Sequence, residues 1–197
     1  MKWFTIGSLT LPASHLALIL AFIAGGVFAR LRYGKECADI YSNAVFLFIA
    51  VWKLSVVLFS FSLVLQAPMS LIYFNGGVKG VWLALLMNLL YSGWKWPREQ
   101  MTALIFTWMV VVIAKEAALP ILNGEFTLML VIQLAGSLVF VTKWLNSLFN
   151  QSNRLILFTL WQIFFYSWNG QLFSMTVLAY SIVAIFWIWN ERRESVG

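Results

Sequence analysis

Charged residues are scarce in this sequence of 197 residues. They make up 10% of it, whereas hydrophobic residues make up 62% and aromatic residues 17%. A soluble domain carries about 25% charged and about 45–50% apolar residues, and a disordered chain combines low hydrophobicity with high net charge. The composition therefore excludes both classes and predicts a membrane protein.

Cysteine and histidine are almost absent, with one residue of each. A single cysteine excludes a disulfide framework, an internal Cys-x-x-Cys redox pair and a multi-cysteine metal site. A single histidine excludes a histidine-based metal cluster. We therefore expect no metal and no cofactor. The net charge of +6 is scattered over short loops and not gathered in one block, so it does not predict nucleic-acid binding.

Long apolar runs are abundant instead. A spanning helix needs about 20 mostly apolar residues. The runs are continuous and do not alternate with a period of two, which favours helices over strands. The sequence predicts an all-α integral membrane protein, a single polytopic domain over residues 1–197 with about seven transmembrane helices. The predicted spans are 11–29, 40–65, 78–91, 101–114, 126–141, 155–168 and 172–189.

The basic residues predict the orientation of these spans. Nine of the 13 lysines and arginines fall in the first, third and fifth loops and the C-terminal tail, all on one side. The positive-inside rule places that side in the cytoplasm, so the N-terminus lies outside and the C-terminus inside. The nine are Arg30, Arg32, Lys35, Lys95, Arg98, Lys143, Arg154, Arg192 and Arg193.

Two ionisable residues fall within predicted spans, where each is costly and is therefore a functional candidate. Lys53 lies midway along the second span. It either faces an internal cavity and meets a phosphate or carboxylate, or it snorkels or forms an internal ion pair. His15 lies near the outer end of the first span. It is either a general base at the outer surface or an interfacial side chain.

The segment from Lys115 to Glu125 is expected to form an outer loop. It follows the fourth span, and Pro120 and Asn-Gly within it are typical of broken helix. Lys115 and Glu125 either flank a lipid headgroup, or they are solvated side chains of an ordinary turn between two helices.

A second outer loop enters the third span through Gly76 and Gly77, with Lys79 just after them. Backbone N–H groups at a helix start, together with a lysine, can hold a phosphate. The same residues are equally well explained as a short turn.

Three short motifs are spread along the chain. Asn123 and Gly124 lie in Leu-Asn-Gly-Glu, Gly170 and Gln171 begin Gly-Gln-Leu-Phe-Ser, and Phe-Asn-Gly-Gly precedes the third span. The chain resembles the prolipoprotein diacylglyceryl transferases, bacterial inner-membrane enzymes with seven spans. That family carries Ile-Asn-Gly-Glu, Gly-Gln-hydrophobic-hydrophobic-Ser and a Pro…Trp-Asp/Glu-Gly-Gly element at similar places.

The resemblance implies a function. The family moves a diacylglyceryl group from phosphatidylglycerol to the lipobox cysteine of a preprolipoprotein. It implies a multi-pass protein of the bacterial cytoplasmic membrane, with phosphatidylglycerol as ligand and a preprolipoprotein or another membrane or extracytoplasmic protein as partner. Lys53, Lys79 and Lys115 would hold the lipid phosphate, and Glu125 or His15 would act as the base.

The chain departs from the family pattern at several places. It lacks the His-Gly-Gly stretch, Ala-Ala-Leu-Pro-Ile replaces the family's Arg-Leu-Gly-Asn-Phe, and residues 155–171 contain no cation. Arginines suit phosphate binding because they pair bidentately, and a lysine does not reproduce that geometry. Three readings stay open: a transferase with an altered site, a catalytically inactive scaffold or partner protein on the same fold, and a small substrate-binding transporter subunit.

Overall fold

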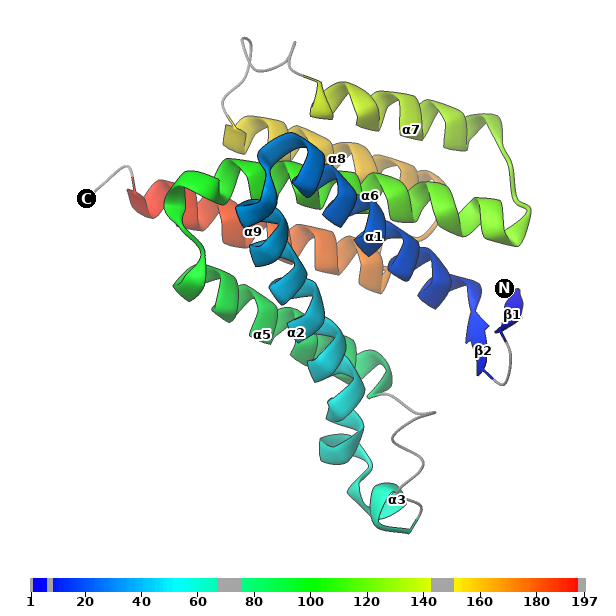
Figure 1. Ribbon diagram of the computed structural model, residues 1–197. Helices are drawn as coiled ribbons and strands as arrows, with labels where there is room; N and C mark the ends of the chain where they lie inside the picture. Colours follow the sequence, from blue (N-terminus) through cyan, green and yellow to red (C-terminus); the bar gives the residue numbers. More distant parts are fainter. Residues whose placement is uncertain (1, 7–8, 67–75, 143–150, 195–197) are drawn as a thin grey trace.

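The computed structural model describes residues 2–6, 9–66, 76–142 and 151–194, and its long helices pack side by side (Figure 1). Within these residues, each of the seven predicted apolar segments carries one long helix. The helices are α1 (Ala13–Tyr33), α2 (Lys35–Phe59), α5 (Gly77–Lys95), α6 (Met101–Asn123), α7 (Leu128–Val141), α8 (Gln151–Trp168) and α9 (Met175–Glu194). A short helix η1 (Arg98–Gln100) precedes α6.

The start of the first span differs from the prediction. Residues expected to be helical from position 11 instead form part of an antiparallel hairpin, in which β1 (Trp3–Ile6) pairs with β2 (Leu9–Pro12). Proline disfavours helix at the residue before it, so Leu11 stays extended, and Pro12 itself has an extended backbone directly before α1. The second span is also interrupted, because α2 ends at Phe59 and a short helix α3 (Phe61–Gln66) follows Ser60.

The end of α6 differs most from its predicted position. The expected outer loop from Lys115 is wrong, because the helix continues through Pro120 to Asn123. Proline removes only the backbone hydrogen bond to the carbonyl of Glu116, and this loss lies in the final two turns. Lys115 and Glu116 therefore lie on a helix, about 10 Å from its end at 1.5 Å per residue.

Small residues let α1 approach α6 closely. Every fourth residue along one face of α1 is alanine or glycine and is buried. A Cβ atom added at Gly25 would lie 2.5 Å from Val111 Cγ2 on α6 and 2.5 Å from the Tyr41 hydroxyl on α2. Because helices in membranes associate through such close contacts, this face fixes α1 against α6. The buried residues are Ala13, Ala17, Ala21, Gly25 and Ala29.

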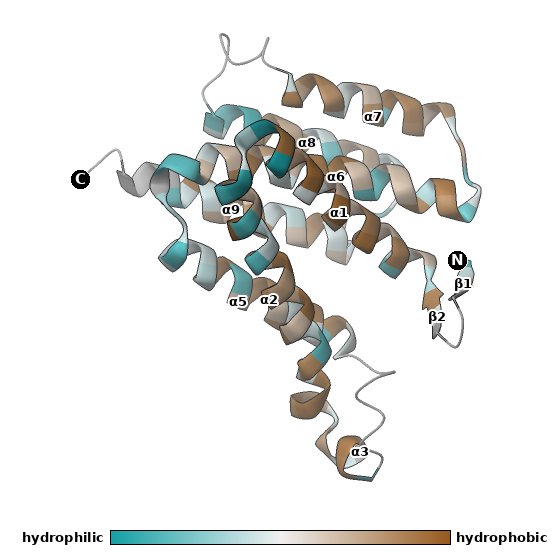
Figure 2. Cartoon of the chain, in the orientation of Figure 1, coloured by the Kyte–Doolittle hydropathy of each residue, from teal (hydrophilic) through white to brown (hydrophobic). Residues whose placement is uncertain are grey.

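Hydrophobic residues occur along all the long helices (Figure 2), and many of their side chains are exposed. Phe46 is 74% exposed and Trp94 86% exposed, a pattern that a lipid-facing surface explains. Within the described residues, α1, α2 and α6 are long and apolar enough to cross a membrane. Residues 128–141 and 175–190 form shorter apolar helices.

Arg154 lies in a helix and not in the cytoplasmic loop that the sequence predicts. It belongs to the first turn of α8 and is 2% exposed. Its guanidinium donates to the backbone carbonyls of Phe140 and Thr142 and lies 4.5 Å from the centre of the Phe106 ring. The cation thus binds the free carbonyls at the C-terminal end of α7. Lys143, expected in the same loop, lies outside the described residues.

Candidate functional site: a cavity between five helices

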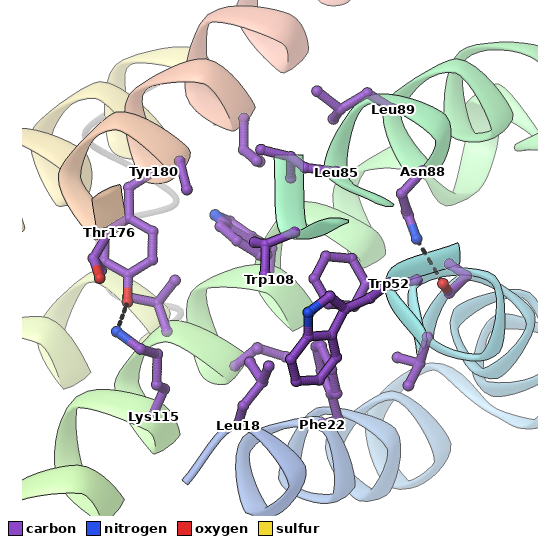
Figure 3. Close-up of a pocket in the computed structure, with 18 of the residues that line it drawn as sticks. Leu18, Phe22, Trp52, Leu85, Asn88, Leu89, Trp108, Lys115, Thr176 and Tyr180 are labelled. Atoms are coloured by element: carbon purple, nitrogen blue, oxygen red, sulfur yellow. Dashed lines mark hydrogen bonds between the residues drawn. The ribbon is translucent and has the colours of Figure 1, made fainter. Parts of the chain in front are cut away.

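A cavity of about 540 Å³ lies among α1, α2, α5, α6 and α9 (Figure 3). Its wall is mostly apolar and contains no aspartate or glutamate among the described residues. Trp108 and Leu85 lie toward its middle, whereas Lys115 and Thr176 lie at one side. Five tryptophans contribute to the wall: Trp52, Trp82, Trp96, Trp108 and Trp187.

Lys115 and Thr176 mark the polar end of this cavity, and the first turns of three helices contribute to its wall. The hairpin joins the start of α1 to the end of α6, because Lys2 N–H donates to Asn123 Oδ1 and Lys2 O accepts from Ala13 N–H. The start of α5 lies beside α2, since Gly76 N–H donates to Trp52 O over 3.1 Å. The first turn of α9 contributes Thr176 to the same wall. None of these three helices has an acidic residue in its first turn.

Lys115 is the cation in this end of the wall, and it belongs to a network with three neighbours. Its Nζ lies 2.9 Å from Glu116 Oε1, 3.2 Å from the Tyr180 hydroxyl and 3.5 Å from the Tyr166 hydroxyl. Both tyrosines donate to the same oxygen of Glu116, over 2.6 Å from Tyr180 and 2.9 Å from Tyr166. The network joins α6 to α8 and α9 and keeps a buried carboxylate hydrogen-bonded, as burial requires.

His15 lies in the first turn of α1 and lines the cavity, as does its neighbour in space, Trp52. The two rings meet edge to face with centroids 4.9 Å apart. Lys53, next in sequence to Trp52, is half-buried and is not among the residues of the cavity wall. The helix rotation that turns Trp52 inward directs Lys53 elsewhere, about 100° around α2.

Packing and hydrogen bonds join the helices around the opposite end of the cavity. Asn88 Nδ2 donates to Ala44 O over 2.6 Å, which joins α5 to α2. Trp96 stacks on Trp187 with ring centroids 5.3 Å apart. These contacts fix the width of the cavity between α2, α5 and α9.

Two of the predicted site residues lie away from this cavity. Glu125 is exposed, in the connection between α6 and α7. Lys79 is exposed on α5, with its Nζ 5.9 Å from the centre of the Phe59 ring. Of the five predicted catalytic and phosphate-binding residues, the cavity wall thus includes His15 and Lys115.

The glycines of two family-like motifs end helices. Gly124 has φ +75° after α6, and Gly170 has φ +69° after α8. Gly124 N–H donates to Ile121 O, and the following N–H of Glu125 donates to Pro120 O. Gly170 and Gln171 make the same pair of bonds to Ser167 and Tyr166. This is the Schellman motif, in which a left-handed residue satisfies the last carbonyls of a helix.

The third glycine motif brings α5 against α2. Gly76 precedes α5, and a Cβ atom there would overlap Ser55 Oγ. Gly77 has φ +56°, a conformation that favours glycine. The pair therefore makes a close turn into α5, which agrees with the short turn expected for this segment.

Sequence reasoning missed three residues of the polar network: Glu116, Tyr166 and Tyr180. The sequence predicts a loop at Glu116, because the charged pair of Lys115 and Glu116 interrupts the apolar run. A signal was present, since apolar residues 117–122 continue the run beyond the charged pair. The two tyrosines carried no signal, because they meet Glu116 only after α8 and α9 pack on α6.

No three histidine, cysteine, aspartate or glutamate side chains gather as a metal site within the described residues. Comparisons of the chain with family models, curated proteins and solved structures find no match. The resemblance to the diacylglyceryl transferases therefore stays a prediction.

Proposed function

We propose that this protein binds a phospholipid with an anionic headgroup, of the phosphatidylglycerol type, in the cavity between α1, α2, α5, α6 and α9. The single observation that carries the proposal is this cavity, which is mostly apolar and has one lysine and the first turns of three helices in its wall. Acyl chains would occupy the tryptophan-lined part, and the headgroup would lie beside Lys115.

The dimensions and lining support an apolar ligand. Ligand sites of about 300–1,000 Å³ with mainly hydrophobic and aromatic walls hold small molecules well, and the cavity measures about 540 Å³. Such a volume would take the headgroup and part of the acyl chains, with the remainder in the bilayer.

The charges support an anionic headgroup. A helix N-terminus carries about half a positive charge, and residues from the first turns of α1, α5 and α9 contribute to the wall. Lys115 adds a cation, and the described wall has no carboxylate of its own. A phosphate at this end would therefore meet positive potential from several directions.

The membrane arrangement belongs to the same proposal. All seven long helices would cross the bilayer, with the N-terminus outside and the C-terminus in the bacterial cytoplasm. The starts of α1, α5 and α9 and the end of α6 would then face the outer leaflet. An accessibility assay with single cysteines at Lys35 and Glu125, each in a Cys37→Ala background, would report opposite sides of the membrane.

Diacylglyceryl transfer is the second candidate, and the observation that favours it is that His15 and Lys115 line one cavity. His15 would accept the thiol proton of a lipobox cysteine, and the sulfur would attack the diacylglyceryl carbon that carries the phosphate. The carbon–oxygen bond would break as the carbon–sulfur bond forms, and glycerol phosphate would leave beside Lys115. Incubation with labelled phosphatidylglycerol and a lipobox peptide tests it. A diacylglyceryl thioether that depends on His15 supports transfer, and its absence with lipid binding retained leaves the binding function alone.

A matched pair of substitutions tests lipid binding in the cavity. Leu85 on α5 lines the cavity, whereas the neighbouring Leu86 is 55% exposed on the outside. We expect phosphatidylglycerol to raise the melting temperature of the wild type and of Leu86→Trp in detergent. Leu85→Trp places an indole in the middle of the cavity and obstructs it, so this variant should show no such rise. An equal rise in all three proteins would mean that the lipid binds elsewhere.

A further inference from the structure

The ammonium group of Lys115 has no spare hydrogen-bond donor in this structure. An ammonium has three N–H donors, and here they meet Glu116 Oε1, the Tyr180 hydroxyl and the Tyr166 hydroxyl at 2.9, 3.2 and 3.5 Å. An anionic headgroup can therefore reach Lys115 only by replacing one of these partners.

Of the two charged residues, Lys115 is the one that faces the cavity. Its side chain is 18% exposed and belongs to the cavity wall, whereas that of Glu116 is 11% exposed and does not. Glu116 thus lies behind the lysine as seen from the cavity. A bound phosphate would meet the ammonium first and would be repelled by the carboxylate behind it.

The two tyrosines allow this exchange without leaving a bare carboxylate. Glu116 Oε1 accepts from Tyr166 over 2.9 Å and from Tyr180 over 2.6 Å, in addition to the bond from Lys115. When Lys115 turns to a ligand, both hydroxyl donors stay on Glu116. The cost of releasing the lysine is therefore far below that of exposing an unpaired buried charge.

We propose that Glu116 is an internal competitor for Lys115 and thereby sets how strongly the cavity prefers anionic over zwitterionic headgroups. This inference rests on the proposed lipid-binding function and identifies Glu116 as a specificity-determining residue. Zwitterionic phosphatidylcholine carries a cation beside its phosphate, so it gains less than phosphatidylglycerol when Glu116 loses its charge.

The test measures dissociation constants for phosphatidylglycerol and phosphatidylcholine in the same detergent, with wild type, Glu116→Gln, Lys115→Met and a control. We expect Glu116→Gln to strengthen phosphatidylglycerol binding about tenfold and to leave phosphatidylcholine binding within about twofold. Lys115→Met should remove most of the preference. The control Glu99→Gln changes an exposed carboxylate in η1 and should leave both constants unchanged.

A purely structural role for Glu116 predicts a different outcome. The substitution would then weaken both lipids equally, or leave their ratio at the wild-type value, and either result overturns the competitor proposal. If the Leu85→Trp variant binds lipid as tightly as the wild type, the proposed function itself fails. If the cavity binds lipid but the ratio is unmoved, only the role of Glu116 fails.

A measurement on the wild type covers the case in which Glu116→Gln does not fold. Infrared difference spectra should show a shifted carboxylate stretch when phosphatidylglycerol is added, because Lys115 leaves Glu116. Phosphatidylcholine should give a smaller shift, and Glu116→Asp should show a band at an altered frequency. No carboxylate change with phosphatidylglycerol would contradict the exchange.

Discussion

The hydroxyl of Tyr180 donates to Oε1 of Glu116 over 2.6 Å and thereby joins α9 to α6 at the polar end of the cavity. Tyr180 is 6% exposed and Glu116 8% exposed, so both groups are buried. The contact both closes the wall between these helices and holds the carboxylate behind Lys115.

Loss of this hydroxyl should destabilise the protein. Tyr180→Phe leaves the ring in place but removes one donor from a buried carboxylate, which costs about 1–3 kcal/mol. Thermal unfolding in detergent should therefore begin at a lower temperature. Tyr91→Phe, at a half-buried tyrosine on α5, is the matched control and should change the unfolding temperature little. Equal behaviour of the two variants would show that the bond to Glu116 contributes nothing measurable.

Two adjacent glycines on α1 should respond oppositely to alanine. At Gly25 the new Cβ would lie 2.5 Å from atoms of Tyr41 and Val111, whereas at Gly26 the nearest atom lies 3.5 Å away. Gly25→Ala should therefore push α1 from α6 and cost about 1–3 kcal/mol. Gly26→Ala should be neutral or stabilising by up to about 1 kcal/mol, since alanine favours a helix. Urea or thermal unfolding of the two variants checks the contrast, and a stable Gly25→Ala would refute the close packing.

The glycines after α6 and α8 should act as helix caps and not as site residues. Alanine at Gly124 or Gly170 must adopt a left-handed backbone, at a cost of about 1–2 kcal/mol. Asparagine tolerates this conformation better, so Gly124→Asn and Gly170→Asn should fall between wild type and alanine in stability. Phosphatidylglycerol affinity of the folded variants should stay at the wild-type value. A loss of binding without a loss of stability would show that these glycines contribute to lipid binding.

Arg154 should be required for the packing of α7 on α8. Arg154→Gln removes the charge that binds the carbonyls of Phe140 and Thr142, and about 2–4 kcal/mol of stability should be lost. Thermal unfolding in detergent should then occur at a lower temperature than in the wild type. The adjacent exposed residue supplies the control, since Asn153→Ala should leave the unfolding temperature unchanged.

The sequence located the helices well and some of their ends poorly. Continuous apolar runs are needed to satisfy the backbone in a membrane, so the positions of seven helices follow from composition. The end of α6 did not follow, because Lys115, Glu116 and Pro120 look like a loop in sequence. Packing on α1 and the cap at Gly124 outweigh these signals in the fold.

The candidate site was only partly predictable for a related reason. Lys115 and His15 were identified because ionisable groups near apolar runs are unusual. Lys53 was identified by the same rule, but the rule does not give the rotation of a helix, and Trp52 takes the inward position instead. Tyr166 and Tyr180 are separated from Glu116 by 50 and 64 residues, so only tertiary packing reveals their role.

The amount of phospholipid that stays with the purified protein tests the central claim most directly. Wild type, Leu85→Trp and Leu86→Trp would be purified in the same mild detergent, and the lipid extracted from each would be quantified by mass spectrometry. The account predicts that wild type and Leu86→Trp retain an anionic phospholipid and that Leu85→Trp loses it while remaining folded. Retention of the same lipid by folded Leu85→Trp would contradict binding in the cavity.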